Sequence, residues 1–138
     1  NILVTSEDGI KLIDFGVARM ENMASVTLTG AVLGTPRYMP PEQIRGEKVD
    51  ARADIYAVGV TFFEMLTGIR GSQNPTVERM VGGTSIQQLI LRQNLPSPLV
   101  AIVLRCLEGD KNRRYATPND LVADLTAFES RPAGLDEL

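Results

Sequence analysis

The chain has 138 residues, of which 43% are hydrophobic and 22% charged, a composition typical of one soluble globular unit. A net charge of −3 and the lack of a basic run argue against a nucleic-acid-binding module, and no apolar stretch is long enough to span a membrane. With no histidine, His-based metal sites and His general bases are excluded. The single cysteine, Cys106, rules out an internal disulfide and favours a reducing, cytoplasmic location.

The first predicted element is a β-hairpin with a polar group at each end. Residues 1–4 and 10–13 are largely apolar, and Ser-Glu-Asp-Gly at 6–9 is a turn sequence. Folding this hairpin brings Asn1 and Asp14 side by side. An amide oxygen and a carboxylate are hard ligands that suit Mg²⁺, so we predict a magnesium site there.

Two segments without helical periodicity follow the hairpin. Residues 17–33 contain several hydroxyl side chains and a glycine, and predict a loop. Residues 34–42 read Gly-Thr-Pro-Arg-Tyr-Met-Pro-Pro-Glu, in which three prolines restrict the backbone.

The rest of the chain predicts helices. Residues 54–68 are apolar on nearly every helical face, which indicates a helix enclosed by protein and ended by Gly68. Further helices are predicted from Thr84, over residues 97–108 and over residues 117–130, where Ser97-Pro98 and Thr117-Pro118 are start signals. Residues 131–138 predict a frayed tail. Cys106 falls on an apolar helix face, where a buried thiol is expected.

Several motifs, in this order and at this spacing, resemble those of protein kinases. They are Asp-Phe-Gly at 14–16, Pro-Pro-Glu at 40–42, Asp-x-Tyr-x-x-Gly at 54–59 and the run from Glu108 to Arg114. The chain resembles the C-terminal half of the catalytic domain of a eukaryotic-type serine/threonine protein kinase, most like the bacterial group. The resemblance implies a mainly α fold over residues 1–130: a kinase C-lobe with a short N-terminal β-hairpin, an activation loop and about five helices.

The resemblance also implies roles for individual residues. Asn1 matches the last residue of the catalytic-loop motif His-Arg-Asp-x-x-x-x-Asn, and with Asp14 would hold Mg²⁺ on the phosphates of ATP. Thr35 would hydrogen-bond near the catalytic aspartate, in the loop that receives the protein substrate. Asp54 would accept backbone N–H groups of the catalytic loop, or else cap its own helix.

Other residues have implied regulatory and structural roles. Ser25, Thr27 and Thr29 are candidates for activating phosphorylation, the alternative being a hydroxyl-rich solvated loop. Glu42 is expected to pair with Arg114, with the adjacent Arg113 as the other possible partner. If the pair were instead two solvated surface charges, it would contribute little to stability.

The implied function is Mg²⁺-dependent transfer of the ATP γ-phosphoryl group to Ser or Thr of protein substrates. The chain begins inside a motif, so we expect it to be a fragment of a longer protein, which could be anchored in a membrane. The Gly-rich loop, the phosphate-binding Lys and the catalytic Asp would lie upstream, so we expect the fragment alone to be inactive, and the missing N-lobe to cover it. The alternative is a non-catalytic kinase-like module that binds nucleotide or partners.

Overall fold

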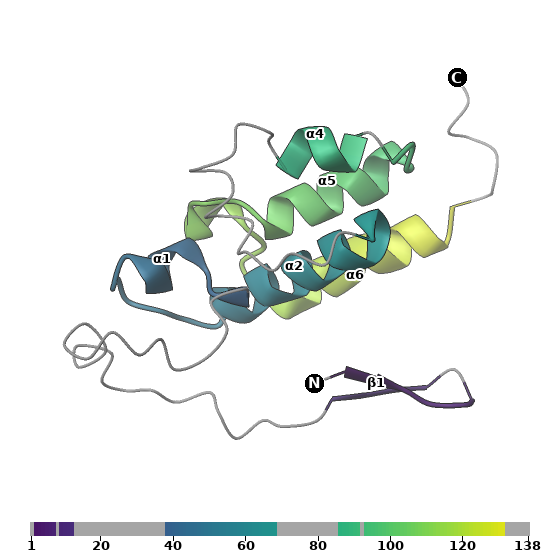
Figure 1. The fold of residues 1–138 in the computed structure, drawn as a ribbon, viewed down its shortest axis with the longest axis horizontal. Helices are drawn as coiled ribbons and strands as arrows, with labels where there is room; N and C mark the ends of the chain where they lie inside the picture. The colour runs from purple at the N-terminus through teal and green to yellow at the C-terminus, as the bar shows by residue number, and fades with distance from the viewer. Residues whose placement is uncertain (1, 8, 13–37, 69–85, 92, 132–138) are drawn as a thin grey trace. The chain divides into compact units, whose positions relative to one another are not determined.

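The computed structural model describes residues 2–7, 9–12, 38–68, 86–91 and 93–131. The chain divides into two units, residues 1–33 and residues 34–138, and each is described by itself. The first holds a short antiparallel hairpin and the second is helical, which confirms the predicted mainly α fold with an N-terminal hairpin (Figure 1).

The hairpin consists of β1 (Ile2–Val4) and β2 (Ile10–Leu12). Ile2 lies opposite Leu12 and Val4 opposite Ile10, so the register is that of a simple antiparallel pair. Thr5 closes the turn, because its backbone N–H donates to the Gly9 carbonyl (2.7 Å) and its hydroxyl accepts the Gly9 N–H (3.0 Å). The apolar side chains of both strands are exposed: Ile2, Leu3, Val4, Ile10 and Leu12.

The helical unit begins with a short helix and a long one. Helix α1 (Pro41–Ile44) has a proline at its first position, where a missing N–H costs no hydrogen bond. Helix α2 (Arg52–Thr67) starts two residues before the predicted helix and ends as predicted at Gly68, whose φ of 66° is left-handed.

The described ranges of this unit contain three further helices and one 3₁₀ helix. They are α4 (Ile86–Leu91), α5 (Ser97–Cys106), the 3₁₀ helix η4 (Lys111–Arg113) and α6 (Pro118–Glu129). The predicted starts of α5 and α6 are confirmed, and α6 has a full capping box between Thr117 and Asp120. The predicted start of α4, Thr84, lies outside the described residues. None of the helices in the described ranges combines the length and the apolar character needed to cross a membrane.

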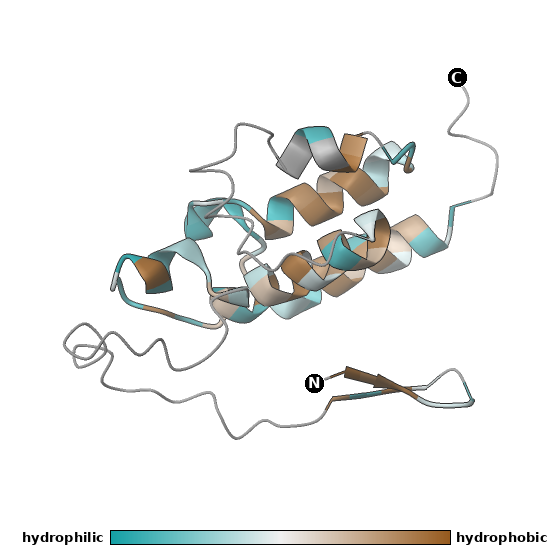
Figure 2. Cartoon of the chain, viewed as in Figure 1, coloured by the Kyte–Doolittle hydropathy of each residue, from teal (hydrophilic) through white to brown (hydrophobic). Residues whose placement is uncertain are grey.

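The core lies where α5 packs against α2, α4 and α6. Figure 2 shows apolar segments along α2 and α5. One group of buried side chains joins α2, α4 and α5, and a second joins α2, α5 and α6. The first comprises Tyr56, Val60, Phe63, Ile90, Val100, Val103 and Leu107, and the second comprises Ile55, Ile102, Cys106, Tyr115 and Leu121.

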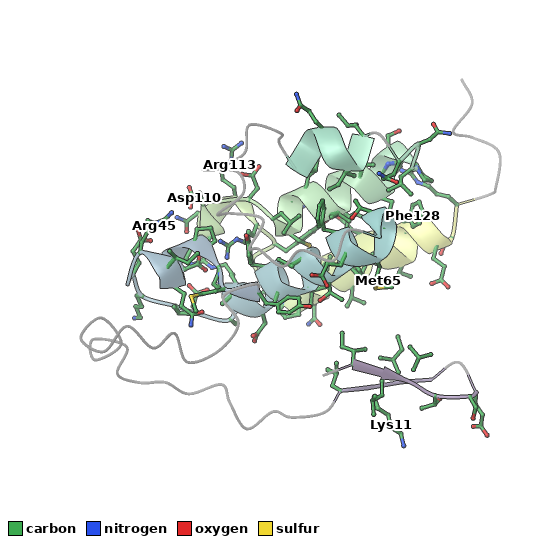
Figure 3. All side chains as sticks on the ribbon, viewed as in Figure 1. Lys11, Arg45, Met65, Asp110, Arg113 and Phe128 are labelled. Carbon is green, nitrogen blue, oxygen red and sulfur yellow. The ribbon has the colours of Figure 1, made fainter. Side chains whose placement is uncertain are left out.

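Two details of this core concern which helix faces are buried. On α5, Val100 is buried, whereas the adjacent Leu99 is only half-buried. On α2, Val58 and Met65 are exposed, with 73% of Met65 accessible to solvent, so the described part of the unit leaves a stripe of this helix uncovered (Figure 3).

Candidate functional site

Glu42 and Arg114, which the kinase resemblance pairs, meet at the α1 end of the helical unit. Arg114 Nη1 donates to Glu42 Oε1 (2.8 Å) and Arg114 Nη2 donates to Glu42 Oε2 (2.7 Å). Both residues are buried, Glu42 with 1% and Arg114 with 3% of its surface exposed. Of the two adjacent arginines it is therefore Arg114 that contacts Glu42, while Arg113 lies on the surface 3.8 Å from Glu108.

Arg114 also reaches two other parts of the chain. Its Nε donates to the Glu108 carbonyl (2.8 Å) and its Nη1 donates to the Arg52 carbonyl in the first turn of α2 (3.1 Å). Its guanidinium lies 4.9 Å from the centre of the Tyr56 ring. One side chain thus joins α1, the start of α2 and the loop after α5.

The ion pair changes the titration of Glu42. Burial alone raises the pKa of its carboxyl group, because it penalises the charged form. The hydrogen bonds and the charge of Arg114 act in the opposite direction and outweigh burial, so the pKa of Glu42 is lowered overall. Glu42 is ionised at neutral pH, mainly because of its hydrogen bonds to Arg114.

A second set of polar contacts surrounds this pair. Arg52 Nη2 donates to Asp50 Oδ2 (2.7 Å) and its Nη1 to Asn112 Oδ1 (3.0 Å), while Lys111 Nζ donates to the Lys48 carbonyl (2.6 Å). Hydrogen bonds from the side chain and backbone N–H of Arg52 hold the pKa of Asp50 well below its usual range. These contacts tie the loop before α2 to η4. In Figure 3, Asp110 and Arg113 lie at this end of the unit, on the same side of the view as Arg45.

The segment before α1 is held by a further hydrogen bond. The Tyr38 hydroxyl donates to Glu64 Oε2 (3.0 Å) on α2, across 26 positions of sequence. Tyr38 belongs to the Gly-Thr-Pro-Arg-Tyr-Met-Pro-Pro-Glu stretch that contains Glu42. Two residues of this stretch, four positions apart, are therefore bonded to different parts of the helical unit.

The prediction that Asp54 caps its own helix is wrong. The N-cap position of α2 is Ala51, which makes Asp54 the third helical residue, with an exposed side chain. Asp50 Oδ1 instead accepts the backbone N–H of Arg52 (3.0 Å) at the start of the helix. Because that acceptor lies further upstream, the helix begins before the position that Asp54 would cap. The Asp54 carboxylate lies in the first turn of α2, where the helix dipole favours a negative charge.

The other predicted site residues lie outside the described residues. They are Asn1, Asp14, Ser25, Thr27, Thr29 and Thr35. Within the ranges that the structure describes, no group of three or more Cys, Asp or Glu side chains could hold a metal ion. The magnesium site and the phosphorylation sites therefore remain predictions from the sequence.

Sequence reasoning missed the Tyr38–Glu64 and Arg52–Asn112 contacts. Each joins residues far apart in sequence, and no local pattern marks either pair. The run of alternating charges at 47–54 is the one sequence signal that could have indicated the cluster around Arg52.

Comparison with known proteins gives a consistent match along the chain. The profile of the protein kinase domain family matches residues 1–124. Curated relatives include a probable serine/threonine-protein kinase of Clostridium perfringens, 32% identical over 136 residues and 96% of this chain. The serine/threonine-protein kinase PknB is 36% identical in Mycobacterium leprae, over 94% of this chain, and 37% identical in Mycobacterium tuberculosis, over 91%.

The chain is much shorter than these relatives. The matched region is 20% of the Clostridium perfringens protein, 22% of the Mycobacterium leprae protein and 21% of the Mycobacterium tuberculosis protein. The chain thus spans about a fifth of the length of the curated relatives it matches.

Proposed function

The chain belongs to the protein kinase domain family, and from that premise we propose that it is the C-lobe of a serine/threonine protein kinase that transfers the ATP γ-phosphoryl group to proteins. The observation that carries this proposal is the buried Glu42–Arg114 pair. It joins the Pro-Pro-Glu motif to the Arg-containing motif that follows α5, as the kinase resemblance implies. A charge pair with 0% and 1% of its side chains exposed is costly unless it is well made, so it fixes this segment firmly.

Asn1 and Asp14 are the residues that would hold magnesium. An amide oxygen and a carboxylate are both hard donors, and Mg²⁺ bound by only one or two protein groups keeps phosphates and waters as its other ligands. Ile2 lies opposite Leu12 in the hairpin, and Asn1 precedes the first by one residue while Asp14 follows the second by two. This register supports a shared site at the open end of the hairpin. When bound, Mg²⁺ neutralises the charge on the phosphates of ATP.

The segment around Thr35 is proposed to bind the protein substrate. The segment ends at Glu42, which Arg114 holds in place. A peptide with a Ser or Thr hydroxyl would therefore bind to a segment whose C-terminal end has a fixed position. Upstream of it, Thr27, Thr29 and Ser25 are proposed sites of activating phosphorylation. A phosphate adds nearly two negative charges and orders a loop when arginines are in reach.

Asp54 is proposed to accept backbone N–H groups of the catalytic loop. Its side chain is exposed in the first turn of α2, which leaves the carboxylate accessible to such donors. Hydrogen bonds between an ionised carboxylate and backbone N–H groups are among the stronger ones in proteins.

These 138 residues alone are proposed to be inactive. The chain has no histidine and therefore no His-Arg-Asp motif, and it has no Gly-rich phosphate loop followed by Val-Ala-x-Lys. Phosphoryl transfer depends on positioning and electrostatic stabilisation, so loss of half of the phosphate-binding groups removes the catalytic arrangement. We propose that the missing groups lie in an upstream part of the same protein, in the cytoplasm. An N-lobe in that part would supply the Gly-rich loop and the phosphate-binding Lys and would cover part of this chain.

The test compares the natural protein that carries this chain with the 138-residue polypeptide. Each is incubated with labelled ATP, Mg²⁺ and a generic Ser/Thr protein substrate, and phosphoserine and phosphothreonine are measured. We expect transfer by the natural protein, loss of transfer in its Asp14→Asn variant, and none from the polypeptide. An Asp110→Asn variant is the control that should keep its activity, because Asp110 is exposed and an asparagine oxygen can still accept the Asn112 backbone N–H.

The alternative is a non-catalytic module. It is favoured if the natural protein binds ATP but transfers no phosphate to any substrate or to itself. Turnover by the 138-residue polypeptide would instead overturn the proposal that it is inactive on its own.

A further inference from the structure

Helix α2 begins without a capping side chain at its N-cap position. That position is Ala51, which has no side-chain oxygen to accept the first N–H groups of the helix. Asp50, one residue upstream, accepts two of them: its carboxylate accepts the N–H of Arg52 (3.0 Å) and its carbonyl accepts the N–H of Ala53 (3.0 Å). The first turn of α2 therefore depends on where Asp50 is held.

Two cations hold the Asp50 carboxylate. Arg52 donates to both of its oxygens, from Nε to Oδ1 (3.0 Å) and from Nη2 to Oδ2 (2.7 Å), and Lys111 Nζ lies 3.6 Å from Oδ2. Each cation is also bonded to another segment. Arg52 Nη1 donates to Asn112 Oδ1 (3.0 Å) on η4, and Lys111 Nζ donates to the Lys48 carbonyl (2.6 Å). We call Asp50, Arg52, Lys111 and Asn112 the polar clamp.

Asp54 lies in the same turn as Arg52 but on a different side of the helix. Residues two positions apart in a helix do not face each other, so Arg52 bonds η4 while the side chain of Asp54 is exposed. From Ile55 onward packing fixes the helix, since Ile55 and Tyr56 are buried in the core. The turn that carries Asp54 precedes this packed part. It is fixed by the polar clamp and by the bond from Arg114 to the Arg52 carbonyl.

We infer that the polar clamp holds the Asp54 carboxylate in place for the catalytic loop, which makes Arg52 a positioning residue for phosphoryl transfer. The inference rests on the proposed function, in which Asp54 accepts backbone N–H groups of that loop, and deepens it by assigning what fixes Asp54 itself. Arg52 acts through the first turn of α2, because its own side chain bonds Asp50 and η4. A displaced carboxylate would displace the loop, and small errors in the position of reacting groups greatly reduce the rate.

The first test is Arg52→Met in the natural protein. Methionine has a similar helix propensity but cannot donate to Asp50 or Asn112. We expect kcat to fall about three- to tenfold, as fits the loss of partly exposed hydrogen bonds between charged groups. The KM for ATP and the KM for the protein substrate should stay unchanged, because an interaction that acts only in the transition state alters kcat alone. The assay is run well below the melting temperature, where a purely structural role would leave kcat unchanged.

Arg45→Met is the matched control. Arg45 also donates from Nε and Nη2 to both oxygens of a carboxylate two positions away, that of Glu47 (2.6 and 3.2 Å). This pair is exposed and follows α1, so the variant removes the same chemical group without altering the first turn of α2. We expect wild-type values of kcat and of both KM values.

Two further variants test how Arg52 acts. Arg52→Lys keeps the charge but cannot reach both Asp50 oxygens and Asn112 at once, so its kcat should lie between that of the wild type and that of Arg52→Met. In an Asp54→Asn background, Arg52→Met should cause no further loss of kcat, because the carboxylate that the polar clamp positions is already absent.

Hydrogen exchange gives a readout that does not depend on activity. The N–H groups of Arg52 and Ala53 are bonded to Asp50, so they should exchange faster in Arg52→Met than in the wild type or in Arg45→Met. Amides of α5, which packs in the core, should keep their wild-type protection.

The outcomes separate this inference from the proposed function. If the wild-type protein transfers no phosphate, the proposed function is wrong and the positioning role falls with it. If the wild type is active but Arg52→Met keeps the wild-type kcat, or changes only a KM, the positioning role is disproved while the kinase function stands. An equal loss of kcat in Arg45→Met, a full further loss in the Asp54→Asn background, or unchanged exchange at the start of α2 also disproves it.

Discussion

At the scale of single residues, Arg114 has the widest set of contacts in the described part of the site. It bonds Glu42, the carbonyl of Glu108 and the carbonyl of Arg52, and it packs near the ring of Tyr56. Five N–H donors in a planar fork allow one side chain to satisfy acceptors from separate segments, which a lysine could not do. We therefore expect this position to tolerate substitution poorly.

Replacing Glu42 by Gln should destabilise the protein strongly. The change leaves the Arg114 charge buried without its counter-charge, which costs about 3–5 kcal/mol of the free energy of unfolding. Urea denaturation measures this loss. The control is Glu47→Gln, which removes a carboxylate from the exposed Arg45–Glu47 pair and should change the free energy of unfolding little, because exposed ion pairs are screened by solvent. Equal losses in the two variants would contradict a buried, energetically important pair.

Cys106 should be unreactive in the folded protein. It is fully buried, and burial raises the pKa of its thiol to about 12, so the nucleophilic thiolate is absent at pH 8. A thiol reagent should label the protein at pH 8 only in urea above the unfolding midpoint. An Ala123→Cys variant, with an added thiol at an exposed site on α6, should react at one thiol without urea. Rapid labelling of the folded wild type would mean that Cys106 is accessible.

At the scale of elements, α2 and α5 approach closely because residue 59 has no side chain. A Cβ atom on Gly59 would lie 2.6 Å from the Cβ of Cys106 and 3.2 Å from Leu107. A separation of 2.6 Å is too short for two carbon atoms, and helix backbones do not yield as a flexible side chain can. The Asp-x-Tyr-x-x-Gly motif therefore has a packing reason for its glycine.

Gly59→Ala should destabilise the protein in spite of alanine's higher helix propensity. Overpacking typically costs about 1–3 kcal/mol, against a gain of up to about 1 kcal/mol from propensity. We expect a lower urea midpoint and weaker protection of α2 and α5 amides in hydrogen exchange. Gly109→Ala, where an added Cβ meets nothing within 4 Å, should change the midpoint little. A Gly59→Ala variant more stable than the wild type would show that the two helices can separate at no cost.

The helices show which boundaries can be predicted from local sequence and which cannot. Thr117-Pro118 and Ser97-Pro98 predicted the starts of α6 and α5, because a proline in the first turn acts within a few residues and Thr117 also caps α6, whereas Ser97 is the first residue of α5 and caps nothing. The start of α2 was predicted too late, since Asp50 and not Asp54 accepts the first N–H. Helix α1 was not predicted at all, because four residues carry no periodicity and Glu42 is held by a partner 72 positions away.

At the scale of the whole molecule, stability should fall in acid. The pKa values of Glu42 and Asp50 are both lowered in the folded protein, so each group binds protons more readily when the chain is unfolded. Their contribution to stability is present above the unfolded pKa values of about 4 and is lost as the pH falls below them. Urea midpoints measured between pH 7 and pH 3 should drop more steeply for the wild type than for Glu42→Gln. Parallel curves for the two proteins would show that Glu42 does not titrate with folding.

The site was predictable only in part, and for a physical reason. Glu42 and Arg114 could be paired because two recognisable motifs each contain one of them, whereas Tyr38 and Glu64 had no such marker. A side-chain bond across 26 positions depends on the path of the chain in space, and no local periodicity records that path. The magnesium and phosphorylation residues remain predictions from the motifs alone.

The three-way contact of Arg114 has a consequence for the kinetics of folding. The bond to Glu42 closes a ring of 72 positions, and closing a long ring is entropically unfavourable until the helices inside it have packed. A charge pair is also poorly rewarded while water still surrounds it. We therefore expect the pair to form after the rate-limiting step of folding, so that Glu42→Gln raises the unfolding rate far more than it lowers the folding rate, as stopped-flow measurements in urea would show.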